Sequence, residues 1–416
     1  MNYLISFSIF RRNRNFALLY IGQFISFLGT MITSVALPYQ IYTLTHSTLM
    51  VGLLSLFQLV PLIFTALVGG VFADRYHRRF LLLLAESVLV IGCSILAWNA
   101  HLDSPHVWVI FVAAMLMSAF NGLHRPALES IVQQLVAKED FPIVGSLGTF
   151  KRSVCMIAGP AIGGLIIATS GVVITYLVDC ATFAVSLTAL LLMSHIPKPV
   201  LSVPDDSSWA SLKAGLRYAK SRQELLGTYF VDFIAMVFGM PMALFPAIAM
   251  TFGGAKVLGM LYAAPAVGAL FISLFSAWAK EVKRHGAAVA ISAAFWGVSI
   301  VLFGLSSNLY ASLFFLALAG GFDAVSGIFR SVMWNQTIPI SLRGRMAGIE
   351  MISYIGGPRL GDAEAGLMAA AFGITFSVVS GGVLCVLGVG VCCWFLPRFW
   401  HYEAPDFSST DEVAVI

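Results

Sequence analysis

Charged residues are scarce in this chain of 416 residues. Asp, Glu, Lys and Arg together make up 11% of the sequence, whereas hydrophobic residues make up 59%. A soluble domain carries roughly twice this share of charge. The scarcity excludes an ordinary water-soluble fold and predicts a protein that crosses a membrane several times. The net charge of +4 is small and gives no indication of nucleic-acid binding.

Several chemical signatures are also missing. The six cysteines lie within apolar stretches, where cysteine behaves as a small hydrophobic residue, so neither a disulfide framework nor a metal site is predicted. The sequence holds no phosphate-binding loop of the form Gly-x-x-x-x-Gly-Lys-Ser/Thr, which argues against transport driven by ATP. Histidines and cysteines are scattered, so a membrane-embedded enzyme is disfavoured, and we expect no catalytic residue and no cofactor.

Long apolar stretches dominate what is present. A membrane-spanning helix needs about 20 apolar residues, and the sequence offers about twelve stretches that meet this requirement. The predicted spans cover residues 16–44, 50–72, 80–100, 107–135, 143–169, 172–193, 225–252, 257–279, 287–306, 309–329, 346–372 and 374–396. We therefore predict an all-α polytopic membrane protein with twelve transmembrane helices.

The basic residues of the loops indicate an orientation. Arginine and lysine in short loops stay on the cytoplasmic side of the membrane. If both termini are cytoplasmic, the inner turns collect nearly all of the loop cations, and the outer turns hold only Lys256. We therefore expect a multi-pass protein of the inner (cytoplasmic) membrane with both termini in the cytoplasm.

Weak internal repetition divides the chain into two halves. Val51-Gly52-Leu53 corresponds to Leu258-Gly259-Met260, and Gly159-Pro160 corresponds to Gly357-Pro358. We predict two pseudo-symmetric six-helix halves (1–194 and 225–397), a cytoplasmic linker with an amphipathic helix (195–224) and a tail (398–416). Duplicated halves are typical of transporters that bind substrate near mid-membrane.

The glycine–proline pairs have a physical meaning of their own. Proline removes a helix hydrogen bond, and glycine permits close approach of a neighbouring helix. We therefore expect a bend or tight packing at Gly159 and Pro160 and at Gly357 and Pro358.

One loop motif resembles a known family. The pattern Gly70-x-x-x-Asp74-Arg75-x-x-Arg78-Arg79 is similar to the signature loop of the major facilitator superfamily. Shorter motifs resemble its enterobactin-exporter and macrolide-efflux branch, among them Gly22-Gln23-Phe24-Ile25-Ser26 and Gly361-Asp362-Ala363-Glu364-Ala365-Gly366. Ser118 stands where proton-driven drug antiporters of the family carry an arginine, so their chemistry does not transfer through that position. The resemblance implies the major facilitator fold.

The resemblance also implies a cytoplasmic gate. Asp74 would meet the N-terminus of the eleventh helix near Arg345, and Glu281 would act more weakly in the second half. The positive end of a helix dipole makes such a contact worth about 1 kcal/mol, so it can break in each cycle. The full gate set is Gly70, Asp74, Arg75, Arg78, Arg79, Glu281 and Arg345. The alternative is that these charges only set the topology.

Ionisable residues inside the membrane are functional hypotheses, because each is costly in lipid. Asp323 is the first candidate for proton coupling, followed by Asp232 and Glu364. The alternative for each is a role in helix packing. We interpret Asp179 and His124 as packing residues.

A second group of residues suggests substrate binding. Arg359 and Asp362 are three residues apart on one helix face, so they either pair locally or leave Arg359 to bind an anionic substrate. The other candidates for lining an amphiphilic cavity are Phe24, Phe120, Asn121 and Phe322.

These features together favour a proton-coupled secondary transporter that exports an amphiphilic organic molecule, such as a siderophore or macrolide, by alternating access. A broad multidrug exporter is the alternative within this class, and a passive channel or membrane-embedded enzyme is the alternative outside it. The expected partners are a small-molecule substrate, protons and the lipid bilayer, and we expect a monomer.

Overall fold

The structure, a computed structural model, describes residues 8–194, 217–339 and 342–403. Within these ranges it describes the backbone alone for residues 8, 67–75, 343–345 and 347–355. Every regular element in the described ranges is a helix. Most of the predicted 195–224 linker lies outside the described residues.

The first part of the chain forms long helices with short connections. They are α1 (Ser8–Arg12), α2 (Arg14–Thr45), α3 (Thr48–Arg75), α4 (Arg78–His101), α5 (Val107–Leu135) and α6 (Phe141–Leu192). The backbone of α6 leaves the helical region at Gly171, where φ is 81° and ψ is 175°. Only glycine adopts such a conformation readily, so α6 consists of two consecutive helices. They correspond to the predicted spans 143–169 and 172–193.

The second part is less regular. Its helices are α8 (Gln223–Phe238), α9 (Phe245–Phe252), α10 (Ala255–Leu274), α11 (His285–Leu305), α12 (Leu309–Thr337), α13 (Arg343–Phe372), α14 (Ile374–Phe395) and α15 (Pro397–Trp400), with 3-10 turns η2 (Met242–Leu244) and η3 (Ser276–Glu281). The predicted span 225–252 is present, but it is not a single helix. It is interrupted between α8 and α9, because Gly239 ends α8 and Pro241 cannot donate a backbone hydrogen bond.

The described chain holds twelve segments that can cross a membrane. Ten segments of the described chain are long and apolar enough to span a bilayer. One of the ten contains both helices of α6, and the charged helix α13 adds a further span of 30 residues. The protein is therefore an all-α polytopic membrane protein, as the hydrophobic stretches predict.

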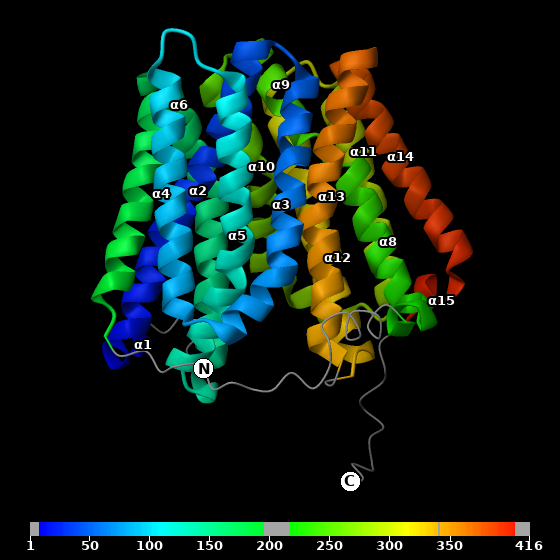
Figure 1. The fold of residues 1–416 in the computed structure, drawn as a ribbon. Coiled ribbons are helices and arrows are strands. Elements are labelled where there is room, and N and C mark those ends of the chain that lie inside the picture. The colour runs from blue at the N-terminus through cyan, green and yellow to red at the C-terminus, as the bar shows by residue number, and fades with distance from the viewer. Residues whose placement is uncertain (1–7, 195–216, 340–341, 404–416) are drawn as a thin grey trace.

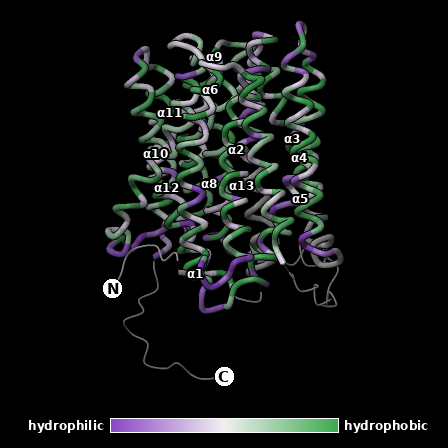
Figure 2. Tube along the Cα trace, turned by 90° about the vertical axis from the view of Figure 1, so that its left-hand side faces the viewer, coloured by the Kyte–Doolittle hydropathy of each residue, from purple (hydrophilic) through white to green (hydrophobic). Residues whose placement is uncertain are grey.

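The helices form one bundle with two distinct ends. Figure 1 places α1 and α15 near one end and α9 at the other, and we call these the α1 end and the α9 end. We call α2–α6 the first-half helices and α8–α14 the second-half helices. Hydrophobic residues run along the height of the bundle, and hydrophilic ones gather mostly near its ends (Figure 2).

Glycines join the two sets of helices at the α9 end. A Cβ on Gly259 of α10 would lie 2.5 Å from the carbonyl oxygen of Pro160 on α6, and one on Gly366 of α13 would lie 2.6 Å from that of Thr48 on α3. The partner glycines are Gly164 and Gly52, whose Cα atoms face these positions. Both helix pairs therefore touch backbone to backbone. The repeated glycines at 52 and 259 thus serve equivalent contacts.

We expect Gly259→Ala to weaken closure at the α9 end. The added methyl group would overlap the α6 backbone, so α6 and α10 must separate, although alanine itself favours a helix by about 1 kcal/mol. Spin labels on the exposed residues Ser170 and Lys256, in a background without native cysteines, would report a longer or broader distance distribution by pulsed electron resonance.

Gly148→Ala is the matched control on α6, since a Cβ there meets nothing within 4 Å in the described structure. An unchanged distribution in Gly259→Ala would contradict closure by this glycine contact.

Candidate functional site

A cavity of about 440 Å³ lies between the first-half and second-half helices. Its volume is within the range of pockets that hold small organic molecules. Five methionines line it, three from the first-half helices and two from the break between α8 and α9: Met31, Met117, Met156, Met240 and Met242. Methionine side chains are flexible and polarizable, so this wall can adapt to apolar ligands of different shape.

Arg359 supplies the cation of the cavity wall. It projects from α13, and its Nη1 donates a hydrogen bond of 2.7 Å to Oε1 of Gln58 on α3. Asn121 and Ser118 line the cavity from α5, and Ser118 donates to the carbonyl oxygen of Gln58 at 2.8 Å. The wall therefore combines a methionine-rich surface with a small polar group centred on a guanidinium.

Asp362 lies next to this polar group but has other partners. Its Oδ2 accepts a hydrogen bond of 2.7 Å from Ser55 of α3, and its Oδ1 accepts one of 2.8 Å from the backbone N–H of Ala243 in η2. The described residues show no ion pair between Arg359 and Asp362. Asp362 instead joins α13 to α3 and satisfies a backbone group exposed by the break after α8.

Two of the predicted proton-coupling residues meet at an arginine that the sequence analysis missed. Arg330 of α12 forms an ion pair with Asp232 of α8, and its Nη2 lies 3.4 Å from Oδ1 of Asp323. The Asp232 side chain is 7% exposed and that of Asp323 is 38% exposed. The predicted span ended at residue 329, which placed Arg330 outside it. Its spacing of seven residues from Asp323, two helical turns on one face, was the available signal.

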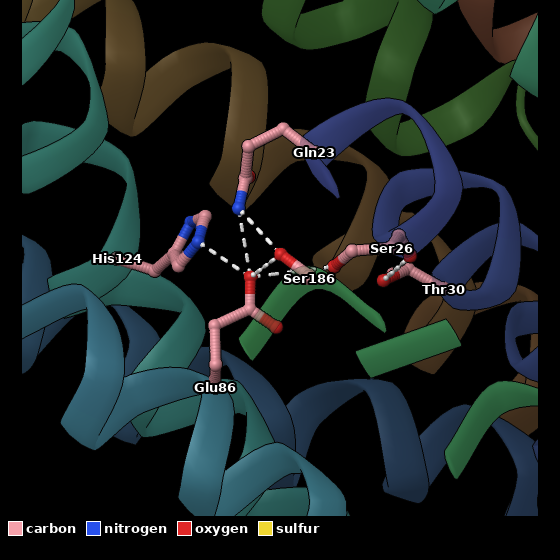
Figure 3. Close-up of polar contacts among 6 residues, drawn as sticks. All are labelled: Gln23, Ser26, Thr30, Glu86, His124 and Ser186. Carbon is pink, nitrogen blue, oxygen red and sulfur yellow. Dashed lines mark hydrogen bonds and ion pairs between the residues drawn. The ribbon is translucent and has the colours of Figure 1, made fainter. Parts of the chain in front are cut away.

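A second polar cluster surrounds Glu86 of α4 (Figure 3). Its Oε1 accepts hydrogen bonds from Gln23 Nε2 at 2.8 Å and Ser186 Oγ at 2.9 Å, and it lies 3.3 Å from Nε2 of His124. The interpretation of His124 as a packing residue omitted this contact. The signal in the sequence was that Glu86 is the one acidic residue in the apolar stretch 80–100.

Asp179 lines the cavity from the second helix of α6 and is fully buried. Its carboxylate accepts hydrogen bonds from Thr33, from Cys93 at 3.3 Å and from Thr182 at 3.1 Å. Three neutral donors therefore surround this acid, and they tie α6 to α2 and α4.

The gate residues are only partly described. The side chains of Asp74, Arg75 and Arg345, and the surroundings of Gly70, lie outside the described residues. Arg78 donates to the carbonyl oxygen of Ser130 at 3.3 Å, and Arg79 donates to those of Leu190 and Leu191 at 2.9 and 2.8 Å. These two arginines therefore connect α4 to α5 and α6 within the first half. Glu281 is exposed in η3.

The predicted aromatic residues lie apart from the cavity wall. Phe24 packs against Phe150, with ring centroids 6.5 Å apart, and Phe322 stacks on Phe295 of α11 at 5.2 Å. Phe120 and Glu364 are half-buried. These predicted residues are not among those that line the described cavity.

The glycine–proline pairs occupy close helix crossings. A Cβ on Gly159 of α6 would overlap Met31 of α2, and one on Gly357 of α13 would lie 2.7 Å from the Cβ of Met236 on α8. Pro160 lines the cavity, and Pro358 follows Gly357 in α13. The two halves thus place these pairs at corresponding helix contacts.

Two solved transporter structures have a fold similar to that of this chain. The fold is similar to that of a POT family transporter in complex with 5-aminolevulinic acid (TM-score 0.74, 13% identity, covering 93% of this chain and 97% of that one). It is also similar to a bacterial homologue of the human lysosomal transporter Spinster in an inward-facing and unoccupied conformation (TM-score 0.71, 14% identity, covering 93% and 97%). At these identities the likeness concerns the fold alone.

Closer relatives appear at the level of sequence. The enterobactin exporter EntS of Salmonella typhi is 27% identical over 390 residues, which cover 93% of this chain and 94% of that protein. EntS of Escherichia coli (strain K12 / MC4100 / BW2952) is 31% identical over 419 residues, covering 99% of each chain. The model of the transmembrane secretion effector family matches residues 6–413. The chain therefore belongs to the transmembrane secretion effector family of the major facilitator superfamily.

Proposed function

We propose that this protein is a proton-coupled secondary transporter that exports an amphiphilic, anionic organic molecule of the siderophore kind across the inner membrane. The observation that carries the proposal is the cavity between the two halves, where Arg359 projects into a methionine-rich wall. The EntS relatives, named as enterobactin exporters, support the substrate class. The methionine lining also favours a second candidate, a broader multidrug exporter.

The proposed substrate class follows from two surfaces of the cavity wall, the guanidinium of Arg359 and the methionine side chains. A planar guanidinium binds carboxylates and other oxyanions through two parallel hydrogen bonds, which a lysine cannot reproduce. The methionines offer apolar contact without a fixed shape. An amphiphilic anion satisfies both surfaces, whereas a small hydrophilic solute would leave the methionines without a partner.

Alternating access accounts for the glycine contacts. The glycine crossings hold the halves together at the α9 end, which the positive-inside rule assigns to the outer side. Release of substrate outward requires these contacts and the hydrogen bond between Ser55 and Asp362 to separate. The halves, taken as 1–194 and 225–397, would then rock about the cavity, and the gate loop with Asp74 and Arg345 would close the α1 end.

Asp323 is the proposed proton carrier of the second half. Arg330 lies between two carboxylates, so the three groups together carry one negative charge when both acids are ionised. Binding one proton neutralises the group. Asp323 is more exposed than Asp232 and farther from the guanidinium, so it exchanges its proton more readily.

Arg359→Lys tests the substrate site. We expect binding of enterobactin to the purified protein to weaken about 10- to 100-fold, because charge-assisted hydrogen bonds contribute about 1.5–3 kcal/mol. Calorimetry or tryptophan fluorescence would measure the dissociation constant. Arg125→Lys, at an exposed position on α5, is the control. An unchanged affinity in Arg359→Lys would remove Arg359 from the site.

Asp323→Asn tests proton coupling. In proteoliposomes with an imposed pH gradient, the wild type should move protons when enterobactin is added, and Asp323→Asn should lose this flux while it still binds enterobactin. Asp103→Asn, at an exposed position, should behave as the wild type. Transport of enterobactin by the wild type without proton movement would refute the coupling.

A further inference from the structure

The Glu86 cluster brings together four helices of the first half. Glu86 comes from α4, Gln23 and Ser26 from α2, His124 from α5 and Ser186 from α6 (Figure 3). The Glu86 side chain is 0% exposed and that of His124 is 14% exposed. The carboxyl group is thus fully enclosed, whereas its one titratable hydrogen-bond partner among the described residues is partly exposed.

The motif Gly22-Gln23-Phe24-Ile25-Ser26 supplies this arrangement. Gln23 and Ser26 point their polar groups at Glu86, and Gly22 allows α6 to approach α2. A Cβ on Gly22 would lie 3.0 Å from that of Ala189 and 3.3 Å from the Cα of Ser186. At this crossing Gln23 Nε2 donates a hydrogen bond of 3.1 Å to the Ser186 hydroxyl.

The net charge of the Glu86 cluster depends on whether the cluster holds a proton. Gln23, Ser26 and Ser186 are neutral, so among the described residues His124 is the only group bonded to Glu86 that can carry a positive charge. All of the described hydrogen bonds go to Oε1, and the buried Oε2 has no partner among the described residues. An isolated ionised carboxylate in such a site costs several kcal/mol. A pair that holds one proton is neutral and avoids this cost.

The buried acid Asp232 of the second half has a different kind of partner. There the buried Asp232 is paired with Arg330, whose charge is permanent at any physiological pH. Glu86 has a histidine instead, and histidine changes its charge near neutral pH. The contrast points to a site built to take up and release a proton, rather than to a fixed ion pair.

The cluster is continuous with the cavity. Met117 and Asn121 line the cavity from α5, and His124 follows at helical spacing on the same face. On α2 the hydroxyl of Thr30, which also lines the cavity, donates to the carbonyl oxygen of Ser26 at 3.1 Å. On α2 and α5 the cluster therefore lies one helical turn from residues that line the cavity.

Other titratable groups lie near the cluster along each helix. Within seven residues of a cluster member they are Tyr20 on α2, Arg79 and Cys93 on α4, Arg125 and Glu129 on α5, and Asp179 and Cys180 on α6. Arg79 bonds to carbonyl groups of α6, and Arg125 pairs with Glu129 at the surface. Asp179 is held by Thr33, Cys93 and Thr182. His124 therefore remains the closest titratable partner of Glu86.

We propose that Glu86 and His124 form a one-proton site of the first half, which exchanges its proton with the cavity through the His124 ring. The proton is held by the Glu86 carboxyl group, whose Oε2 has no partner among the described residues. When the proton binds, the pair changes from one negative charge to neutral, and the proton returns to water in the cavity when it leaves. For its role in transport, this inference rests on the proposed proton-coupled function. The transporter would then have two proton sites, one at Asp323 and one at Glu86 and His124.

Infrared difference spectroscopy tests the site without any substrate. The protein in lipid nanodiscs is compared at acidic and alkaline pH, and the carbonyl stretch of a protonated carboxylic acid is followed. We expect Glu86→Gln to remove a component of this band and Glu129→Gln, an exposed acid on α5, to retain it. His124→Gln keeps a hydrogen-bond donor but cannot be protonated, so the band should persist and appear at a different pH.

The outcomes separate this inference from the proposed function. If Glu86→Gln leaves the band unchanged, the inference is overturned, and so it is if His124→Gln leaves its pH dependence unchanged. Should Glu86→Gln not fold, His124→Gln decides alone. In proteoliposomes, loss of one proton per enterobactin in Glu86→Gln would extend the result to transport. Absence of proton flux in the wild type, with the infrared result intact, would refute the proposed coupling and leave the proton site standing.

Discussion

Backbone contact between glycines at the α9 end is the constraint on which the central cavity depends. The crossings at Gly52 and Gly366 and at Gly164 and Gly259 allow no side chain between the helices. No ion pair among the described residues joins these helices, so opening this end breaks van der Waals contacts and hydrogen bonds such as those of Ser55 to Asp362 and of Arg359 to Gln58. Small residues at helix interfaces are the usual means of close packing in membranes. The same property that seals this end therefore makes it suited to open.

The buried charges follow a second rule, since each must be compensated where it lies. Four buried carboxyl groups have four different sets of partners. Asp232 has an arginine, Asp179 has hydroxyl and thiol donors, Asp362 has a serine and a backbone amide, and Glu86 has a histidine with neutral donors. Only the last of these partners changes charge near neutral pH. The kind of partner sets Glu86 apart from the other three buried acids, whereas Asp323 differs from Asp232, which shares its arginine, by being more exposed.

The sequence predicted the fold to a large extent, because hydrophobic length is a local property. The twelve spans and the break near Gly171 follow from the lengths of the apolar stretches, and tight packing was predicted at the glycine–proline pairs but not at Gly52 and Gly259. The polar clusters were harder to predict. Glu86 meets Gln23, His124 and Ser186 from segments 38 to 100 residues away along the chain, and no local pattern links them. Arg330 was missed because apolar length located the end of its helix too early.

The interruption between α8 and α9 has a consequence for how the chain enters the membrane. The two helices contain 16 and 8 residues, and neither reaches the roughly 20 needed to cross a bilayer alone. The backbone N–H of Ala243 at the break finds its acceptor on Asp362, which is 119 residues farther along the chain. During synthesis this peptide group therefore stays without that acceptor until α13 has been made. The seventh span reaches its final form only late in assembly, when its neighbour from near the end of the chain arrives.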